Sequence, residues 1–144
     1  MRNDSTGIDF TKPIEQGPTS KGFDYYFGIS ASLDMPPYVF IENNRVTAEP
    51  TSSLKQEDAG GRPGPATPGW RHKHVMPRFA DKAIEWIGEN KKKPFFVYIP
   101  LNAPHTPHAP GDEFVGKSGM DRYGDFLMDV DYTIGRVIES SNAH

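Results

Sequence analysis

Two histidines lie in the stretch Pro100–Met120, which we call the histidine loop, and their type and spacing allow acid or anion-binding chemistry. The loop carries His105 and His108, with prolines at 104 and 107 on either side of the first. Proline fixes its own φ angle and restricts the residue before it, so the backbone around His105 is stiff. A histidine held in this way can donate hydrogen bonds to an anion or act as an acid.

The same residues allow two other interpretations. Both histidines can be exposed loop residues without a role, since a single fixed histidine is a weak signal of a functional site. They can also form a metal-binding pair, for which an i, i+3 spacing works on a helix. Prolines at 104, 107 and 110 exclude a helix here. The spacing therefore disfavours the metal pair and leaves the other two interpretations open.

The elements on either side must hold this loop in place. Phe95–Ile99 is a continuous apolar run of strand length, which is typical of a strand covered on both faces. Apolar residues at three- and four-residue spacing predict helices at Val75–Asn90 and Tyr123–Ser140. The stripe of the second helix consists of Tyr123, Phe126, Leu127, Val130, Ile134, Val137 and Ile138. Helix, buried strand, loop and helix indicate an α/β fold, in which ligands bind beyond the carboxyl ends of the strands.

The first half of the chain predicts a small hairpin and a long loop. Tyr38–Ile41 is β-branched and aromatic, Asn43-Asn44 suits a tight turn, and Arg45–Thr47 returns. Glu49–Trp70 is rich in proline and glycine, which predicts a surface loop. A loop of this length is normally functional or mobile.

The composition excludes several classes of function and site. The chain has 144 residues, a net charge of −3 and no cysteine. A general nucleic-acid binder would usually carry a basic patch, so no nucleic-acid partner is expected. Without cysteine there is neither a disulfide nor a cysteine-based zinc site. No window is apolar enough for a membrane span, and Met1–Phe10 lacks the apolar run of a signal peptide.

Three groups of residues resemble one family. The segment Lys93–Pro110, KPFFVYIPLNAPHTPHAP, resembles the strand and histidine loop of type I sulfatases. The segment Gly22–Val46, GFDYYFGISASLDMPPYVFIENNRV, is similar to the stretch that precedes it in those enzymes. Tyr123-Gly124-Asp125, Asp131 and Gly135 resemble the helix that follows. The resemblance covers nearly the whole chain, in the order that the family has.

The resemblance implies a fold similar to alkaline phosphatase, with a central sheet flanked by helices on both faces. It implies hydrolysis of sulfate esters in a sulfated carbohydrate or an aryl sulfate. It also implies a formylglycine nucleophile, made from a Cys/Ser-x-Pro-x-Arg motif, and a calcium ion held by carboxylates. The parent enzyme would be periplasmic or secreted.

Few of the family's functional residues have a match in this chain. His105 matches the loop histidine that contacts the sulfate group. Asp34 lies in a loop that approaches the substrate pocket in the family, although it can equally cap a turn ahead of Pro36 and Pro37. The Cys/Ser-x-Pro-x-Arg motif is absent, and no residue matches the calcium ligands. We therefore expect residues 1–144 to be the central part of a sulfatase catalytic domain, truncated at both ends and inactive by itself.

Two other functions stay open at this stage. The chain can be part of a related phosphodiesterase or phosphonate hydrolase, which would use a threonine nucleophile. It can also be a non-catalytic chain that binds sulfated glycans. Tyr38 and Trp70 are candidates for stacking on a sugar ring, although such residues more often close a hydrophobic edge. The sequence determines neither the sulfate ester nor the oligomeric state.

Overall fold

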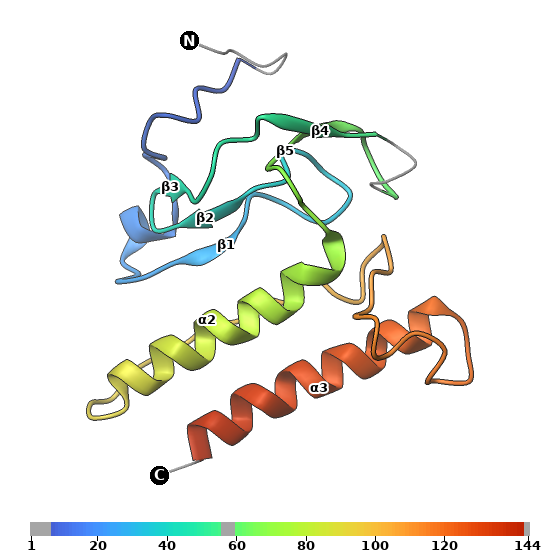
Figure 1. Cartoon of the computed structure of the whole chain (residues 1–144). Coiled ribbons are helices and arrows are strands. Elements are labelled where there is room, and N and C mark those ends of the chain that lie inside the picture. The colour runs from blue at the N-terminus through green and yellow to red at the C-terminus, as the bar shows by residue number, and fades with distance from the viewer. Residues whose placement is uncertain (1–6, 56–59, 143–144) are drawn as a thin grey trace. The chain divides into compact units, whose positions relative to one another are not determined.

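The chain folds into two compact units, Met1–Trp70 and Arg71–His144, and its computed structural model describes residues 7–55 and 60–142 (Figure 1). The first unit contains the short 3-10 helix η1 (Pro18–Lys21) and five short strands. The second contains the 3-10 turn η2 (His72–His74) and two long helices.

An antiparallel sheet of three strands forms the centre of the first unit. β1 (Phe27–Ile29) pairs with β2 (Phe40–Glu42), with Gly28 opposite Ile41. The predicted hairpin is confirmed, because β2 returns as β3 (Arg45–Val46). Asn43 has a φ of 54° in the turn, a conformation that asparagine tolerates better than most residues.

The predicted surface loop Glu49–Trp70 is partly wrong. β4 (Ser52–Leu54) pairs antiparallel with β5 (Gly64–Ala66), while residues 56–59 of that loop lie outside the described part. The central residue of β5 is Pro65, which has no N–H to donate but uses its carbonyl to accept from the Tyr38 N–H at 2.8 Å. A strand that contains proline is allowed at the edge of a sheet, where the missing N–H is not needed. The prolines of this stretch therefore predicted a loop although a strand forms.

Aromatic side chains close the core of the first unit. Tyr38 and Trp70 are 2% and 5% exposed, their ring centroids lie 6.1 Å apart, and Phe40 lies 4.8 Å from Trp70. The Tyr38 hydroxyl donates to the Arg62 carbonyl at 2.6 Å. Burial leaves neither ring a free face for a sugar, so these residues close a hydrophobic edge.

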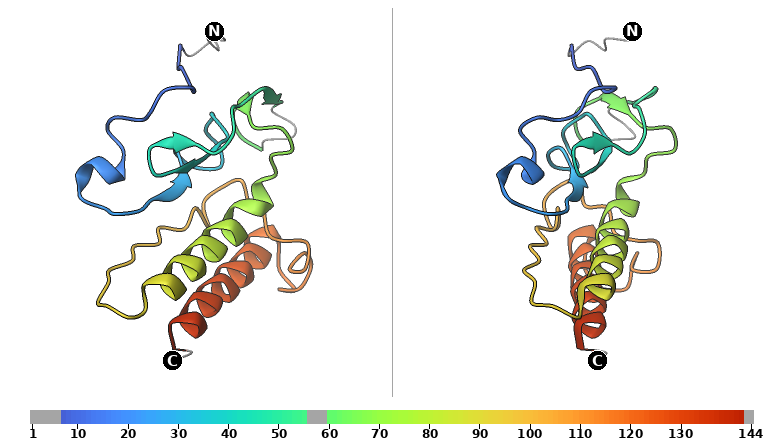
Figure 2. Two further views of the ribbon diagram at one scale, coloured as in Figure 1. Left: turned by 60° about the vertical axis from the view of Figure 1, so that its left-hand side comes forward. Right: turned by 90° about the vertical axis from the view of Figure 1, so that its left-hand side faces the viewer.

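Two helices dominate the second unit. α2 (Val75–Asn90) has the predicted bounds, and α3 (Arg122–Asn142) exceeds the predicted helix by one residue at its start and two at its end. The helices run side by side in the same direction (Figures 1 and 2). An ion pair of 2.8 Å joins Arg136 of α3 to Asp81 of α2. Asp121 caps α3 by accepting from the N–H groups of Tyr123 and Gly124 at 3.0 and 3.2 Å.

The prediction of an interior strand at Phe95–Ile99 is wrong for this structure. The segment follows α2, runs back beside the helices (Figure 2) and belongs to no strand. Phe96 is 76% exposed and Tyr98 is 67% exposed, whereas the Phe95 ring meets the edge of Trp86 at 5.6 Å. An apolar run becomes a strand only when another strand pairs with its backbone, and no described segment does so.

The buried face of α3 also differs from the predicted stripe. Its buried residues are Gly124, Asp125, Phe126, Asp129 and Thr133, while Leu127, Ile134 and Ile138 are at least 40% exposed. The inward face therefore carries two carboxylates. Within the described residues no helix has the length and apolar character needed to cross a membrane.

Candidate functional site: the histidine loop

His105 presents an exposed imidazole near the start of the histidine loop. Its Nδ1 lies 2.5 Å from the carbonyl oxygen of Thr106. A carbonyl oxygen can only accept, so Nδ1 carries the proton of this hydrogen bond. The contact fixes the tautomer and leaves Nε2 as the nitrogen that can meet a ligand. Nε2 accepts a hydrogen bond when the ring is neutral and donates one when the ring is protonated.

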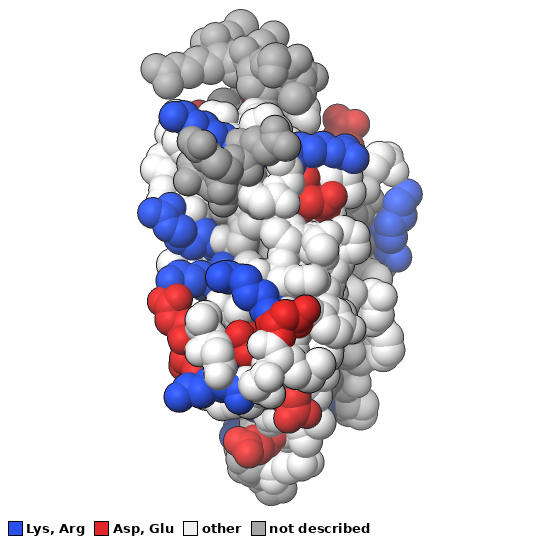
Figure 3. Space-filling view, turned by 90° about the vertical axis from the view of Figure 1, so that its right-hand side faces the viewer, with Lys and Arg blue, Asp and Glu red and all other residues white. Residues whose placement is uncertain are grey.

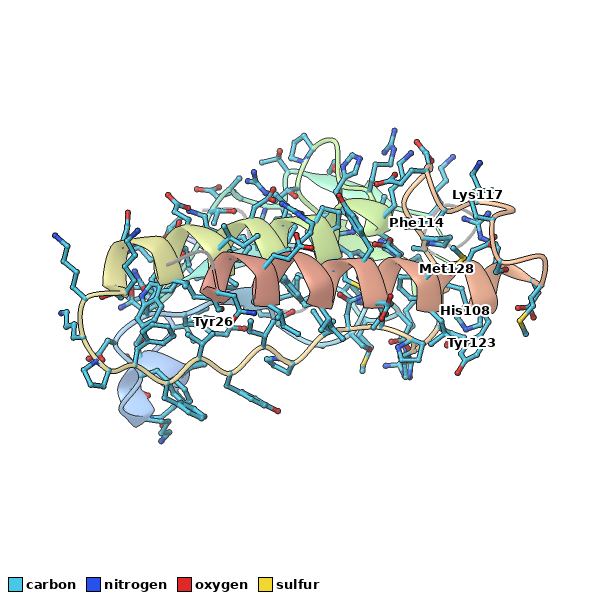
Figure 4. The ribbon with its side chains drawn as sticks, turned by 90° about the horizontal axis from the view of Figure 1, so that it is seen from below. Tyr26, His108, Phe114, Lys117, Tyr123 and Met128 are labelled. Carbon is cyan, nitrogen blue, oxygen red and sulfur yellow. The ribbon has the colours of Figure 1, made fainter. Side chains whose placement is uncertain are left out.

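His108 plays a different part, because its ring packs on α3. The ring lies 5.2 Å from Tyr123 in an edge-on arrangement and 6.3 Å from Phe126. Its carbonyl accepts from Nε of Arg122 at 3.2 Å. Figure 4 shows His108 and Tyr123 next to each other at the beginning of the helix. These contacts make His108 an attachment point of the loop.

Two buried carboxylates of α3 hold the rest of the loop. Asp125 accepts from the Gly116 N–H at 2.8 Å and from the N–H and hydroxyl of Ser118 at 3.0 and 2.7 Å. The bond from Gly116, followed by those from Ser118, lowers the pKa of the Asp125 carboxyl. Asp129 accepts from the Gly111 N–H at 2.8 Å, and burial raises the pKa of its carboxyl.

Asp34, the second predicted site residue, lies in the first unit. It is half-buried and accepts a short hydrogen bond from the Ser32 hydroxyl. Its backbone carbonyl accepts from the Arg62 N–H at 3.0 Å. These contacts are those of a residue that stabilises a turn. A role for Asp34 toward a substrate stays a prediction, as does the role of His105.

The described residues do not fit the calcium ion that the sequence resemblance implies. Within residues 7–55 and 60–142, no three histidine, aspartate or glutamate side chains gather as a metal site requires. On the face drawn in Figure 3, basic and acidic side chains lie next to one another in several places. No step of the chemistry below is assigned to a metal held by this chain.

A comparison with family models matches residues 7–141 to the family described as Sulfatase. The chain belongs to the sulfatase family. Among curated sulfatases, N-acetylgalactosamine-6-O-sulfatase of Bacteroides thetaiotaomicron is 28% identical over 170 aligned positions, which cover 93% of this chain and 33% of that protein. Human N-acetylgalactosamine-6-sulfatase is 32% identical over 62 positions, which cover 42% of this chain and 12% of that protein.

A solved sulfatase structure supports the same assignment. It comes from Bacteroides thetaiotaomicron and was described in the context of the metabolism of multiple glycosaminoglycans. It matches with a TM-score of 0.78 and 26% identity, covering 98% of this chain and 37% of that one. The likeness confirms the predicted α/β sulfatase fold class. The chain spans about a third of the length of these two bacterial sulfatases.

Sequence reasoning found the histidine loop of this sulfatase chain and missed the two carboxylates that hold it. Asp125 and Asp129 are one helical turn apart and interrupt the inward face of α3. Their signal was available, because Asp125 is adjacent to Phe126 and Asp129 is adjacent to Val130, two residues of the predicted apolar stripe. Periodicity considers apolar residues alone, so the predicted stripe of this helix included neither carboxylate.

Proposed function

We propose that this chain is part of an enzyme that hydrolyses sulfate esters, and that His105 contacts the sulfate group. The observation that carries the proposal is the imidazole itself, which is exposed and has Nδ1 tied to the Thr106 carbonyl at 2.5 Å. A ring fixed at one nitrogen offers the other in a defined direction. The match of residues 7–141 to the sulfatase family supports this assignment.

The chemistry assigned to His105 follows from its tautomer. When the ring is protonated, Nε2 donates a hydrogen bond to an oxygen of the sulfate group. Negative charge grows on the bridging oxygen as its bond to sulfur breaks, and a donor already in place stabilises that charge. The same N–H can pass its proton to the departing alcohol. Formylglycine and calcium belong to this proposal as the family's nucleophile and metal, and neither is assigned to a residue of this chain.

The substrate class follows from the names of the relatives. Several are N-acetylgalactosamine-6-sulfatases, from a bacterium and from mammals. We therefore propose a sulfated carbohydrate, with 6-sulfated N-acetylgalactosamine as the first compound to test and an aryl sulfate as the second. Asp34 is the candidate for a contact to the sugar. Periplasmic or secreted localisation belongs to the same proposal.

The test is an assay of the full-length product of the gene that encodes this sequence. Wild type, His105→Ala and His108→Ala are compared on 6-sulfated N-acetylgalactosamine and on an aryl sulfate, with sulfate release as the measurement. Turnover that depends on His105 supports the proposal. Turnover that survives unchanged in His105→Ala removes His105 from the site, and the absence of turnover by wild type on any sulfate ester overturns the enzymatic function.

A further inference from the structure

The inward face of α3 carries an arrangement that the proposed chemistry does not use. Asp125 and Asp129 are four residues apart, so both carboxylates lie on one side of the helix. Each is 3% exposed. Their hydrogen-bond donors all come from the histidine loop, apart from the Thr133 hydroxyl, which lies 3.4 Å from Asp129. A buried carboxylate is costly unless it is well paired, which indicates that these contacts serve a purpose.

Asp125 fixes the far part of the loop. Both of its oxygens are engaged, one by the Gly116 N–H and the other by the two donors of Ser118. Gly116 has a φ of +74°, which favours glycine. The helix also approaches the loop closely, since a Cβ on Gly124 would lie 2.9 Å from Met120 Cβ and from Ser118 Oγ. The loop therefore has little freedom at this point.

Asp129 fixes the part of the loop that is closer to His105. It accepts from the N–H of Gly111, which follows the fully buried Pro110. Two residues earlier, His108 is held by Tyr123 and Arg122. His105 lies three residues before this attachment, a length that spans at most about 10 Å of extended chain. The position of α3 therefore limits where the His105 ring can go.

We infer that Asp125 and Asp129 are positioning residues, which act on the reaction through the placement of His105. This inference rests on the proposed function. The two carboxylates form consecutive attachments between α3 and the loop, and the packing of His108 is the third. When one of the two carboxylate attachments is released, the loop moves away from α3 and the His105 ring loses its alignment with the sulfate group. A displacement of about 1 Å in a reacting group can cost about 10²-fold in rate.

The two carboxylates differ in what can replace them. Asp125 receives three hydrogens, and an ionised carboxylate is acceptor-only. An asparagine there would turn an NH₂ group toward an N–H donor and lose that attachment. Asp129 receives the Gly111 N–H and the Thr133 hydroxyl. An asparagine there can still accept from Gly111 with its oxygen, while its NH₂ donates to a hydroxyl that has rotated to accept. Asparagine should therefore preserve the attachment of the loop at position 129 but not at position 125.

The experiment uses the full-length protein and measures kcat/KM for sulfate-ester hydrolysis. We expect Asp125→Asn and Asp129→Ala to lower it by about ten- to a hundredfold. We expect Asp129→Asn and the exposed control Glu139→Gln to stay near wild type. In the His105→Ala background, Asp125→Asn should have no further effect, because residues that act through one group are not additive. An equal loss in both backgrounds would show a purely structural role and overturn the inference.

A second measurement does not require activity. Lys117 is exposed between Gly116 and Ser118 and is labelled in Figure 4. Release of these two attachments should speed tryptic cleavage after Lys117 in Asp125→Asn, but not in Asp129→Asn or Glu139→Gln. Unchanged cleavage in Asp125→Asn would contradict the anchoring. An unaffected His105→Ala overturns the role proposed for His105, whereas a large loss in His105→Ala with no loss in Asp125→Asn overturns this inference alone.

Discussion

The two ends of the histidine loop are held very differently. From His108 to Ser118 the backbone is bound to α3 by ring packing and by two buried carboxylates. At the other end, the His105 ring contacts the carbonyl of the next residue, and residues 104–106 are exposed. The segment around His105, which is proposed to contact the substrate, is therefore held in place by the adjacent segment that is bound to α3. Binding residues on loops commonly depend on such a scaffold.

Because the two ends are held differently, we expect one end to determine the chemistry and the other to determine the stability of the loop. Substitutions at His105 should change chemistry and leave the unfolding temperature nearly unchanged. Substitutions between His108 and Ser118 should change the stability of the loop, and should change chemistry only through it. The following experiments test that separation, beginning with the largest effect.

The largest effect is expected at the exposed end. In the full-length protein, His105→Ala should lower kcat for sulfate-ester hydrolysis by about 10²–10³, or about 3–4 kcal/mol of transition-state stabilisation, because it removes one preorganised donor. His108→Ala should cost much less activity but lower the unfolding temperature, since it removes the packing on Tyr123. If His105→Ala and His108→Ala lost the same activity and had the same unfolding temperature, the two ends of the loop would not differ in function as proposed. The 144-residue chain by itself should release no sulfate.

The next effect tests the close approach of α3 to the anchored end. Gly124→Ala should destabilise the protein, because overpacking costs about 1–3 kcal/mol and exceeds the gain in helix propensity of about 1 kcal/mol. Gly88→Ala in α2 is the matched control, since Gly88 is exposed and a Cβ there meets nothing within 4 Å. It should stabilise the protein by up to about 1 kcal/mol. Thermal unfolding measures both, and stabilisation by Gly124→Ala would contradict the close contact.

The pH dependence of unfolding distinguishes the two carboxylates. The pKa of Asp125 is lowered from 3.8 in the folded state, so its contribution to stability is present above pH 3.8 and is lost as the pH falls through the folded pKa. The pKa of Asp129 is raised from 3.8, so its contribution is present below pH 3.8 and is lost as the pH rises through the folded pKa.

These signs give opposite predictions for the two asparagine variants. Asp125→Asn should flatten the loss of stability at acid pH, below about 3.8. Asp129→Asn should remove a loss of stability that begins above that pH. Unfolding free energies measured from about pH 3 to 7 test both slopes. A shared slope change in the two variants would show that their surroundings do not differ as described.

The smallest effect is expected from the ion pair on the outside of the loop. Lys73 lies 2.6 Å from Asp112, and the Asp112 carboxylate is largely exposed. Exposed ion pairs contribute little and are screened by salt. Asp112→Asn should therefore leave the unfolding temperature and the cleavage after Lys117 nearly unchanged, in contrast to Asp125→Asn in the first turn of α3. A large effect would mean that exposed charges also anchor the loop.

The sequence predicted those elements whose pattern is complete within a few residues. α2 has the expected bounds because its apolar spacing, Pro77 in its first turn and the lysines after it all agree. The hairpin around Asn43 follows from local turn chemistry in the same way. The histidine loop was located for a similar reason, since its prolines mark where regular structure ends.

The sequence failed where the outcome depends on a distant partner. Phe95–Ile99 has the composition of a strand, but composition does not supply the backbone that must pair with it. β5 contains Pro65 and becomes a strand only because β4 and Tyr38 offer donors. Asp125 and Asp129 turn inward because the loop brings N–H groups to them. The spacing of apolar residues contains no information on hydrogen bonds that a distant loop donates to a buried carboxylate.

The exposed segment Phe95–Ile99 has a consequence for how the chain behaves in solution. Unpaired apolar backbone is a template for association between copies. Three exposed lysines, Lys91, Lys92 and Lys93, precede it with only Pro94 between, and charges near such a run act as gatekeepers. Their repulsion is screened as the Debye length falls from about 10 Å at 0.1 M salt to about 3 Å at 1 M. The colloidal stability of the 144-residue chain should therefore decrease as salt is added.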